Sequence, residues 1–240
     1  MFRSLIVGFL FLGLSSSSFA IDKKYFEIKK VTIQEVTEEQ PNGLLAQAYG
    51  VASDCSNLPA SPNSFVLNGD LSPAAIDTSG VDQIINIGKA IWKIVEDGKP
   101  AVTKNINTAS ALPRGVSCWT DLSGWSRPFY KTFLVQYENA YGMKVVDFRY
   151  RLIYMAGGNV DGVGKYITNA TFVISKLNVS WGYTFNATVE VPSVFNLGTK
   201  ANPLAGMQMN MHWTVDTTVH HEEVTQSYFI SGDGSLVQMN

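Results

Sequence analysis

The chain has 240 residues, of which 45% are apolar and 16% are charged, and its formal net charge is −2. This balance is typical of a folded protein and excludes a long disordered chain. A nucleic-acid-binding protein needs a basic stripe that displaces phosphate counterions, and this slightly acidic chain has none, so no nucleic-acid partner is expected.

The first twenty residues predict a secretory signal peptide. Arg3 supplies a positive charge, residues 5–14 form a short apolar core, and Ser18 and Ala20 place small residues where a signal peptidase cleaves. The apolar run of about ten residues is too short to span a bilayer, which needs about twenty. We therefore expect an exported protein, periplasmic or extracellular, that begins at Ile21 after cleavage near Ala20.

Residues 21–240 have a length suited to a single all-β domain. Residues 40–80 contain many prolines and other turn formers, which predicts an irregular region with one short strand near 65–67. The two cysteines, Cys55 and Cys118, both lie in the exported part, so a disulfide between them is predicted. It would pin the irregular region and stabilise the fold by roughly 4 kcal/mol on the chain-entropy model. Two separate buried thiols are the alternative.

One amphipathic helix is predicted from about 81 to 97. Ser79 and Asp82 form a capping pair, and apolar residues recur at helical spacing through the segment. Gly98 and Pro100 would end the helix. Packing across a sheet is the ordinary role of such a helix. The alternative is a detachable helix that binds a membrane, although its polar face mixes acids and bases.

From Phe129 onward, apolar and polar residues alternate with a period of two, as in strands with one buried face. Residues 146–154, for example, would turn Phe148 and Tyr150 inward and Arg149 and Arg151 into water. Further strands are predicted at 26–36, 129–138, 165–174, 176–183, 185–191, 207–215 and 221–231. A bulge is expected near Lys29 and Lys30, and turns are expected at 139–142, 157–159, 161–162 and 233–234.

Clean one-sided alternation over strands this long implies two sheets packed face to face with their outer faces in water. We therefore predict a mainly β protein, an antiparallel β-sandwich of seven or eight strands with the 81–97 helix packed on it. A barrel is the second choice.

Three histidines, His212, His220 and His221, are the candidates for a base or a metal ligand at neutral pH. A metal site of His220, Glu222 and His212 is sterically conceivable, but no zinc-ligand motif accompanies it, and no metal or other cofactor is predicted. Serine-nucleophile, P-loop and dinucleotide motifs are also missing. The chain is therefore not expected to be an enzyme. The remaining enzymatic alternative is a hydrolase whose site is assembled only by the fold.

Aromatic residues near predicted loops are the candidate binding residues. An aromatic face with hydrogen-bonding neighbours suits a sugar ring, a lipid headgroup or a protein partner. The competing interpretation is that the tryptophans cap the open ends of the sandwich as part of the core. The candidates fall in two segments and comprise Trp119, Trp125, Arg127 and Tyr130 in the first, and Trp181 and Tyr183 in the second.

These patterns favour a non-catalytic binding protein that recognises a glycan, a cell-envelope component or another protein. The alternative is a membrane-interacting or pore-forming-like β-protein, in which the 81–97 helix and the aromatic loops contact a bilayer. A helix beside an aromatic-rich β-sandwich is similar in architecture to the actinoporins, although no motif aligns and this helix lies well inside the chain.

Overall fold

The computed structural model describes residues 23–37, 84–101, 106–116 and 118–239. These residues form two antiparallel sheets of six strands each, and the inner faces of the two sheets share one hydrophobic core. The prediction of a mainly β protein with two antiparallel sheets is therefore confirmed. Helical structure in these residues amounts to one short turn, α1 (Lys23–Phe26), and one 3-10 turn, η3 (Trp119–Asp121).

Each sheet is built mostly of strands that follow one another in the chain. The turn at residues 180–183 passes from sheet A to sheet B. Sheet A has the strand order β1 (Ile28–Val36), β6 (Phe129–Asn139), β7 (Lys144–Val160), β8 (Val163–Val179), β5 (Ala109–Pro113) and β2 (Ile84–Gly88). Sheet B has the order β12 (Leu236–Gln238), β11 (His221–Ser231), β10 (Ala205–Asp216), β9 (Thr184–Asn196), β3 (Ile91–Glu96) and β4 (Lys99–Pro100).

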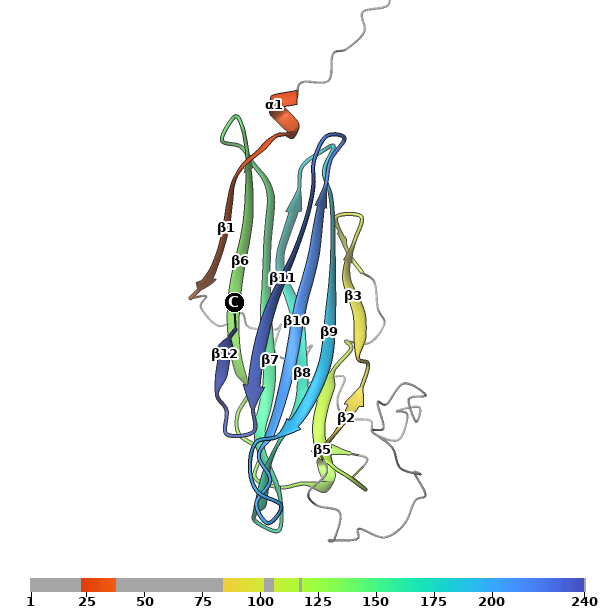
Figure 1. Ribbon diagram of the computed structural model, residues 1–240, viewed down its shortest axis with the longest axis vertical. Coiled ribbons are helices and arrows are strands. Elements are labelled where there is room, and N and C mark those ends of the chain that lie inside the picture. Colours follow the sequence, from red (N-terminus) through yellow and green to blue (C-terminus); the bar gives the residue numbers. More distant parts are fainter. Residues whose placement is uncertain (1–22, 38–83, 102–105, 117, 240) are drawn as a thin grey trace, which may run out of the picture.

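The longest strands set the elongated shape of this two-sheet body. Strands β7 and β8 have 17 residues each. At about 3.3 Å per residue, they extend for roughly 50 Å along the long axis in Figure 1. The β6–β7 and β10–β11 hairpins and the β8–β9 turn lie together at one end, which we call the apical end. The β7–β8 hairpin and the β9–β10 connection lie at the other end, which we call the basal end.

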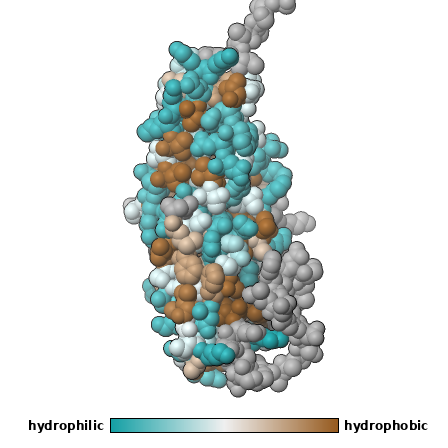
Figure 2. Space-filling model, viewed as in Figure 1, coloured by the Kyte–Doolittle hydropathy of each residue, from teal (hydrophilic) through white to brown (hydrophobic). Residues whose placement is uncertain are grey.

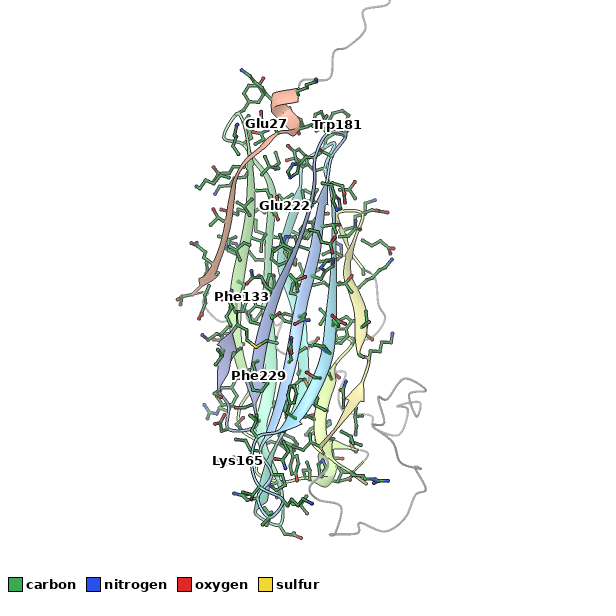
Figure 3. All side chains as sticks on the ribbon, viewed as in Figure 1. Glu27, Phe133, Lys165, Trp181, Glu222 and Phe229 are labelled. Carbon is green, nitrogen blue, oxygen red and sulfur yellow. The ribbon has the colours of Figure 1, made fainter. Side chains whose placement is uncertain are left out.

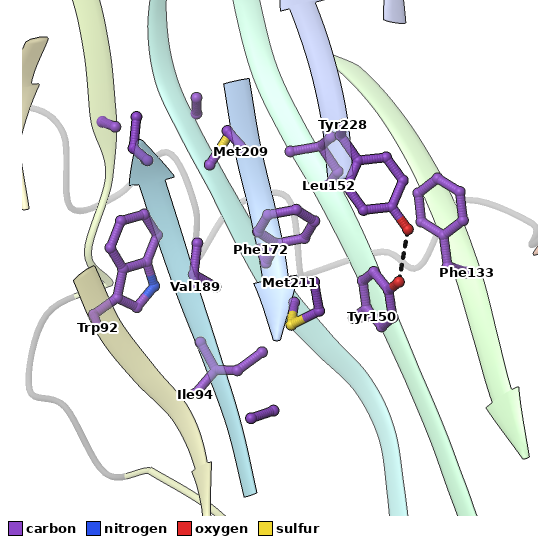
Figure 4. Close-up of a cluster of buried hydrophobic side chains, with 14 of the residues drawn as sticks. Trp92, Ile94, Phe133, Tyr150, Leu152, Phe172, Val189, Met209, Met211 and Tyr228 are labelled. Atoms are coloured by element: carbon purple, nitrogen blue, oxygen red, sulfur yellow. Dashed lines mark hydrogen bonds between the residues drawn. The ribbon is translucent and has the colours of Figure 1, made fainter. Parts of the chain in front are cut away.

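The inner faces carry the apolar rows that the alternating pattern predicts. Phe148 and Tyr150 on β7 and Met209 and Met211 on β10 are completely buried. Figure 4 shows how side chains from both sheets interleave in this core, with Trp92 of β3 at its border. Burial of this apolar surface is the main favourable contribution to folding.

Two hydrogen bonds satisfy polar groups inside the core. The hydroxyl oxygens of Tyr150 and Tyr228 lie 2.7 Å apart, and the indole nitrogen of Trp213 donates to the hydroxyl of Tyr137 at 2.9 Å. Burial raises the pKa of Tyr150 well above its ordinary value, because a phenolate charge is poorly solvated there. The hydroxyls of the core therefore stay protonated.

The outer face of sheet A is less exposed than the sequence pattern predicts. Arg151 is only 1% exposed. Its Nε donates to the hydroxyl of Thr132 at 3.0 Å, and its guanidinium lies 5.1 Å from the centre of the Tyr130 ring. Asp147 is also buried and accepts a hydrogen bond from Nζ of Lys176 at 2.6 Å. Burial raises the pKa of Asp147, but its hydrogen bonds, led by that from Lys176, outweigh burial and bring the pKa below its ordinary value. The prediction of a fully solvated outer face is wrong here.

The predicted helix at 81–97 is wrong for the part that the structure describes. Residues 84–88 form β2 and residues 91–96 form β3, and these strands belong to different sheets. Asp97 and Gly98 have φ values of 49° and 70° and make the tight turn between β3 and β4. Asp-Gly is a strong signal for such a hairpin, and β-branched isoleucine favours strands, so these preferences outweigh the helical spacing. The likeness to the actinoporins, which depended on the helix, is lost with it.

The described residues contain twelve strands rather than seven or eight. Short edge strands account for most of the difference. Residues 165–174 and 176–183 were expected to form two strands, but most of them belong to β8, which continues through a bulge at Ser175. Residues 157–159 were expected to form a turn, but they continue β7. Small residues at these positions mark bulges, which bend a strand without ending it.

The signal peptide at 1–20, the irregular region at 40–80 with its short strand, and Cys55 lie outside the described residues. The Cys55–Cys118 disulfide therefore stays a prediction. Cys118 itself is buried, and its Sγ lies 2.8 Å from the hydroxyl of Thr120. The bulge near Lys29 is confirmed by a register shift in the pairing of β1 with β6.

Candidate binding surface at the apical end

The short helix α1 packs against the β6–β7 hairpin and the β8–β9 turn at the apical end. The backbone carbonyl of Tyr25 accepts hydrogen bonds from the hydroxyl of Tyr183 and from the side-chain amide of Asn139. The hydroxyl of Tyr25 donates to the carbonyl of Trp181 at 3.0 Å. The Phe26 ring lies 6.3 Å from the Trp181 ring and 6.0 Å from the Tyr183 ring. These contacts join α1, the β6–β7 hairpin and the β8–β9 turn into one connected unit.

Trp181 is the most exposed large apolar residue of the described chain, at 83%. It lies in the turn between β8 and β9, and Figure 3 shows it at the apical end, opposite Lys165 at the basal end. The neighbouring Gly182 has a φ of +79°, and a Cβ at this position would lie 2.5 Å from the Phe26 ring. Only glycine fits such a position without strain. Packing therefore fixes the turn on its inner side while the indole stays in solvent.

The two neighbouring hairpins present further apolar side chains. In the β6–β7 turn, the side-chain oxygen of Asn139 accepts hydrogen bonds from the backbone N–H groups of Tyr141 and Met143, at 3.0 and 3.1 Å. Tyr141 and Met143 are each about half exposed, and so is Val219 in the β10–β11 turn. We call the four residues Tyr141, Met143, Trp181 and Val219 the apical tip.

Charges of both signs surround the apical tip. Two nearby acidic residues are in ion pairs, Glu27 with Lys29 at 2.7 Å and Asp216 with His221 at 2.5 Å. The hydrogen bond from Asp216 raises the pKa of His221. The exposed basic side chains near the tip lie on α1 and at the start of β7, and they are Lys23, Lys24 and Lys144.

The structure separates the six predicted binding residues into two groups. Of the two at the apical end, Trp181 is exposed, whereas Tyr183 is buried and supports α1. Arg127 and Tyr130 lie toward the other end. Arg127 is exposed, and the Tyr130 ring lies beneath the guanidinium of Arg151. The basal group comprises Trp119, Trp125, Arg127 and Tyr130.

Trp119 and Trp125 are partly buried and pack against the core. Their ring centres lie 6.5 Å apart with an edge-to-face geometry, and the indole nitrogen of Trp125 donates to the carbonyl of Trp119 at 3.0 Å. A Cβ at Gly158 would lie 2.3 Å from the Trp125 ring, so the glycine in β7 leaves room for this indole. The two tryptophans are thus arranged as side chains that close the basal end of the core.

A shallow pocket lies near the basal end, between Phe129, Lys165 and Asp233. Its volume is about 100 Å³, whereas ligand pockets usually measure about 300–1,000 Å³. The hydroxyl of Ser231 donates to Asp233 and holds the pKa of that carboxyl below its ordinary value. A pocket of this size holds a few water molecules and is too small for a sugar ring.

The three histidines do not converge on one site. Within the described ranges, no three His, Cys, Asp or Glu side chains are placed to hold a metal ion together. Each histidine contacts a different carboxylate, His212 that of Glu223, His220 that of Glu222 and His221 that of Asp216.

Comparison with known proteins identifies no relative, because no family model, curated protein or solved structure matches the chain. Among the residues that the structure describes, no helix is both long and apolar enough to cross a bilayer. The space-filling view in Figure 2 shows hydrophobic residues scattered among hydrophilic ones on the visible face of the body. The functional inference therefore depends on the apical tip.

The sequence pattern did not single out Tyr141, Met143 or Val219 as binding residues. A signal was present for Tyr141, since a large apolar residue inside the predicted 139–142 turn has no core to face. No feature of the sequence indicated that the residues of the apical tip lie close together, because the sequence does not show which turns meet at the same end of the body.

Proposed function

We propose that this protein is an exported β-sandwich binding protein that attaches to a lipid membrane surface through its apical tip. The observation that carries the proposal is the exposure of Trp181 on a projecting turn whose backbone is held by α1. An indole favours the membrane–water interface, because its apolar rings leave water while its N–H stays near polar headgroups.

The arrangement of the apical tip suits a flat, extended partner. Its four apolar side chains lie on three separate turns at the same end of the body. Exposed apolar groups gathered in this way usually mark an interaction surface. Small-molecule and sugar sites are usually concave, whereas these hairpins project outward. The geometry therefore favours a lipid surface over a glycan.

The magnitudes indicate that apolar insertion dominates the binding. Trp181 exposes 83% of its surface. For an aromatic residue of this size, that fraction corresponds to an area of roughly 200 Å². At about 25 cal/mol per Å², complete burial would contribute about 5 kcal/mol and half burial about 2–3 kcal/mol. A lysine near an anionic surface contributes about 1 kcal/mol, and salt screens it. The lysines Lys23, Lys24 and Lys144 should therefore add only a modest preference for anionic lipid.

The test is co-sedimentation of the protein with zwitterionic and with anionic vesicles. We expect Trp181→Ala to weaken vesicle binding by roughly 10- to 100-fold, which corresponds to the half-buried indole. The melting temperature should stay nearly unchanged, because the indole contributes little to the core. Ile91→Ala is the matched control, since Ile91 is an exposed apolar residue on β3 outside the apical tip. Its binding should equal that of the unmodified protein.

Two results would overturn the proposal. The first is the absence of binding to either kind of vesicle, and the second is equal binding by the unmodified protein and Trp181→Ala. Soluble polysaccharides are titrated in parallel with the vesicles. Saturable binding to one polysaccharide without binding to lipid would support glycan recognition instead.

A further inference from the structure

The β10–β11 hairpin, residues 205–231, has histidine as its only basic residue type. It contains no lysine or arginine, and its charged side chains are three acids and three histidines. Each histidine lies against a different acid. The pairs are His212 with Glu223 at 3.4 Å, His220 with Glu222 at 3.4 Å and His221 with Asp216 at 2.5 Å. Three carboxylates give the hairpin a charge of −3, and protonation of the three histidines brings that charge to zero.

Two of these pairs lie beside the apical tip. Val219, a member of the tip, directly precedes His220 and His221 in the turn of the hairpin. The hydroxyl of Thr217 holds this turn by accepting hydrogen bonds from the backbone N–H groups of Val219 and His220, at 3.2 and 2.9 Å. The side chain of His221 is 63% exposed and that of His220 is 33% exposed. Protonation of either histidine therefore changes the charge of the surface that would meet a membrane.

We infer that acid strengthens the attachment of the apical tip to anionic lipid, because protonation of His220 and His221 removes negative charge from the tip. This inference rests on the proposed membrane attachment and names its regulation. Histidine is the side chain whose charge changes between about pH 5 and 8. Above this range, the carboxylates of Asp216 and Glu222 are repelled by anionic headgroups, and below it each carboxylate is neutralised by its own histidine.

The groups around His221 favour its protonated form. Asp216 faces it across the hairpin, and Glu223 lies two residues further on, on the same face of β11. The hydrogen bond to Asp216, followed by the negative charges of Asp216 and Glu223, raises the pKa of His221. On β9, the residue opposite Asp216 is the uncharged Thr184.

The charge of the hairpin is set by its own pairs. His220 lies against Glu222, which in turn lies beside the hydroxyl of Tyr137 on β6. The ion pairs of Lys29 with Glu27 and of Lys30 with Glu138 join α1, β1 and β6 to each other and do not involve the hairpin. The other charged side chains of the apical end, on or beside α1, β1, β6 and β7, are Lys23, Lys24, Glu27, Lys29, Lys30, Glu138 and Lys144.

The third histidine lies too far from the tip to affect binding in the same way. His212 precedes Asp216 by four residues, which places it roughly 13 Å farther along β10 from the turn. At physiological ionic strength, charges are screened over about 8 Å. His212 is therefore a control with the same chemistry, since it also lies against a carboxylate of this hairpin.

The test is co-sedimentation with vesicles between about pH 8 and about pH 5.5, the range in which histidine titrates. One set of vesicles contains phosphatidylcholine alone, and the other contains phosphatidylcholine mixed with the anionic phosphatidylglycerol. One charge near an anionic surface changes the affinity about fivefold. Two protonations should therefore strengthen binding to the mixed vesicles by roughly 10- to 30-fold. Binding to phosphatidylcholine alone should change little.

Three variants separate the histidines. The double variant His220→Gln with His221→Gln should bind the mixed vesicles with nearly the same affinity at all pH values, because glutamine does not titrate. His212→Gln is the matched control and should keep the full pH effect. His221→Lys should bind the mixed vesicles about fivefold more tightly than the unmodified protein at about pH 8. These side chains are at least 33% exposed, so the variants should keep the melting temperature of the unmodified protein.

The outcomes distinguish this inference from the membrane attachment itself. Binding to the mixed vesicles that does not change with pH would overturn the inference and leave the attachment intact. An equally large pH effect on phosphatidylcholine alone would also overturn it, since surface charge would then not be the cause. So would a full pH effect in the double variant, or its loss in His212→Gln. The absence of binding to both kinds of vesicle at every pH would refute the attachment, and the inference with it.

Discussion

Removing one hydroxyl of the buried Tyr150–Tyr228 pair should lower the free energy of unfolding by more than half of what removing both hydroxyls does. The two oxygens lie 2.7 Å apart, and both side chains are completely buried. Tyr150→Phe keeps the ring that packs against Phe133 but leaves the Tyr228 hydroxyl without this partner. An unsatisfied buried polar group costs about 1–3 kcal/mol, whereas replacing both partners with apolar groups of the same shape is nearly neutral.

The measurement is a double-mutant cycle by urea unfolding of the unmodified protein, Tyr150→Phe, Tyr228→Phe and the double variant. Each single variant should lose about 1–3 kcal/mol of unfolding free energy. For a chain of this length, this corresponds to a melting temperature lower by roughly 2–10 °C. The double variant should lose clearly less than the sum of the two single losses. Strict additivity, with a coupling energy below about 0.5 kcal/mol, would refute the role assigned to this hydrogen bond.

Two further outcomes are expected. Burial raises the pKa of core tyrosines such as Tyr154 above the unfolded value near 10. Their contribution to stability is therefore fully present below about pH 10 and is lost as the pH rises above it. Melting temperatures measured from pH 8 to 12 should fall only above about pH 10, and tyrosinate absorbance should appear over the same pH range. Ionisation of all tyrosines in a protein that is still folded would contradict this expectation. In thermal melts, Gly182→Ala should lower the melting temperature more than Gly142→Ala. Both glycines have positive φ, but only a Cβ at Gly182 would clash with the Phe26 ring. Equal losses would mean that backbone strain alone lowers the stability.

The alternating rows of the chain's second half predicted the inner faces correctly. Met209 and Met211 were expected to point inward, and both are completely buried. The period-two pattern reports a local property, because successive side chains of a strand point to opposite faces whatever the strand pairs with. The bulge near Lys29 was predictable for the same reason, since a bulge interrupts the alternation.

The segment at 84–96 shows where local pattern fails. Its apolar residues match helical spacing and, equally, two short strands, the first of which ends at Gly88. Gly88 has a φ of +120°, and a Cβ there would lie 2.1 Å from the carbonyl oxygen of Thr108. Helix formation depends largely on tertiary packing of the apolar face. Here, hydrogen bonds of β2 to β5 and of β3 to β9 decide the outcome.

The candidate binding residues also show where the local sequence is sufficient and where it is not. Trp181 was named from its loop sequence alone, but Trp119 and Trp125 were named by the same criterion and pack against the core. Whether an aromatic residue faces solvent depends on what the rest of the chain places over it, which a single sequence does not show.

By itself, the sequence determined the strand-rich class and the inward rows. These properties depend on residues that are near neighbours in the chain. The tertiary structure alone decided which turns share the apical end and that β1 is a border strand, because strand order depends on pairings between residues far apart in sequence. The chemistry of the apical tip is local, whereas its availability to a partner is a property of the whole fold.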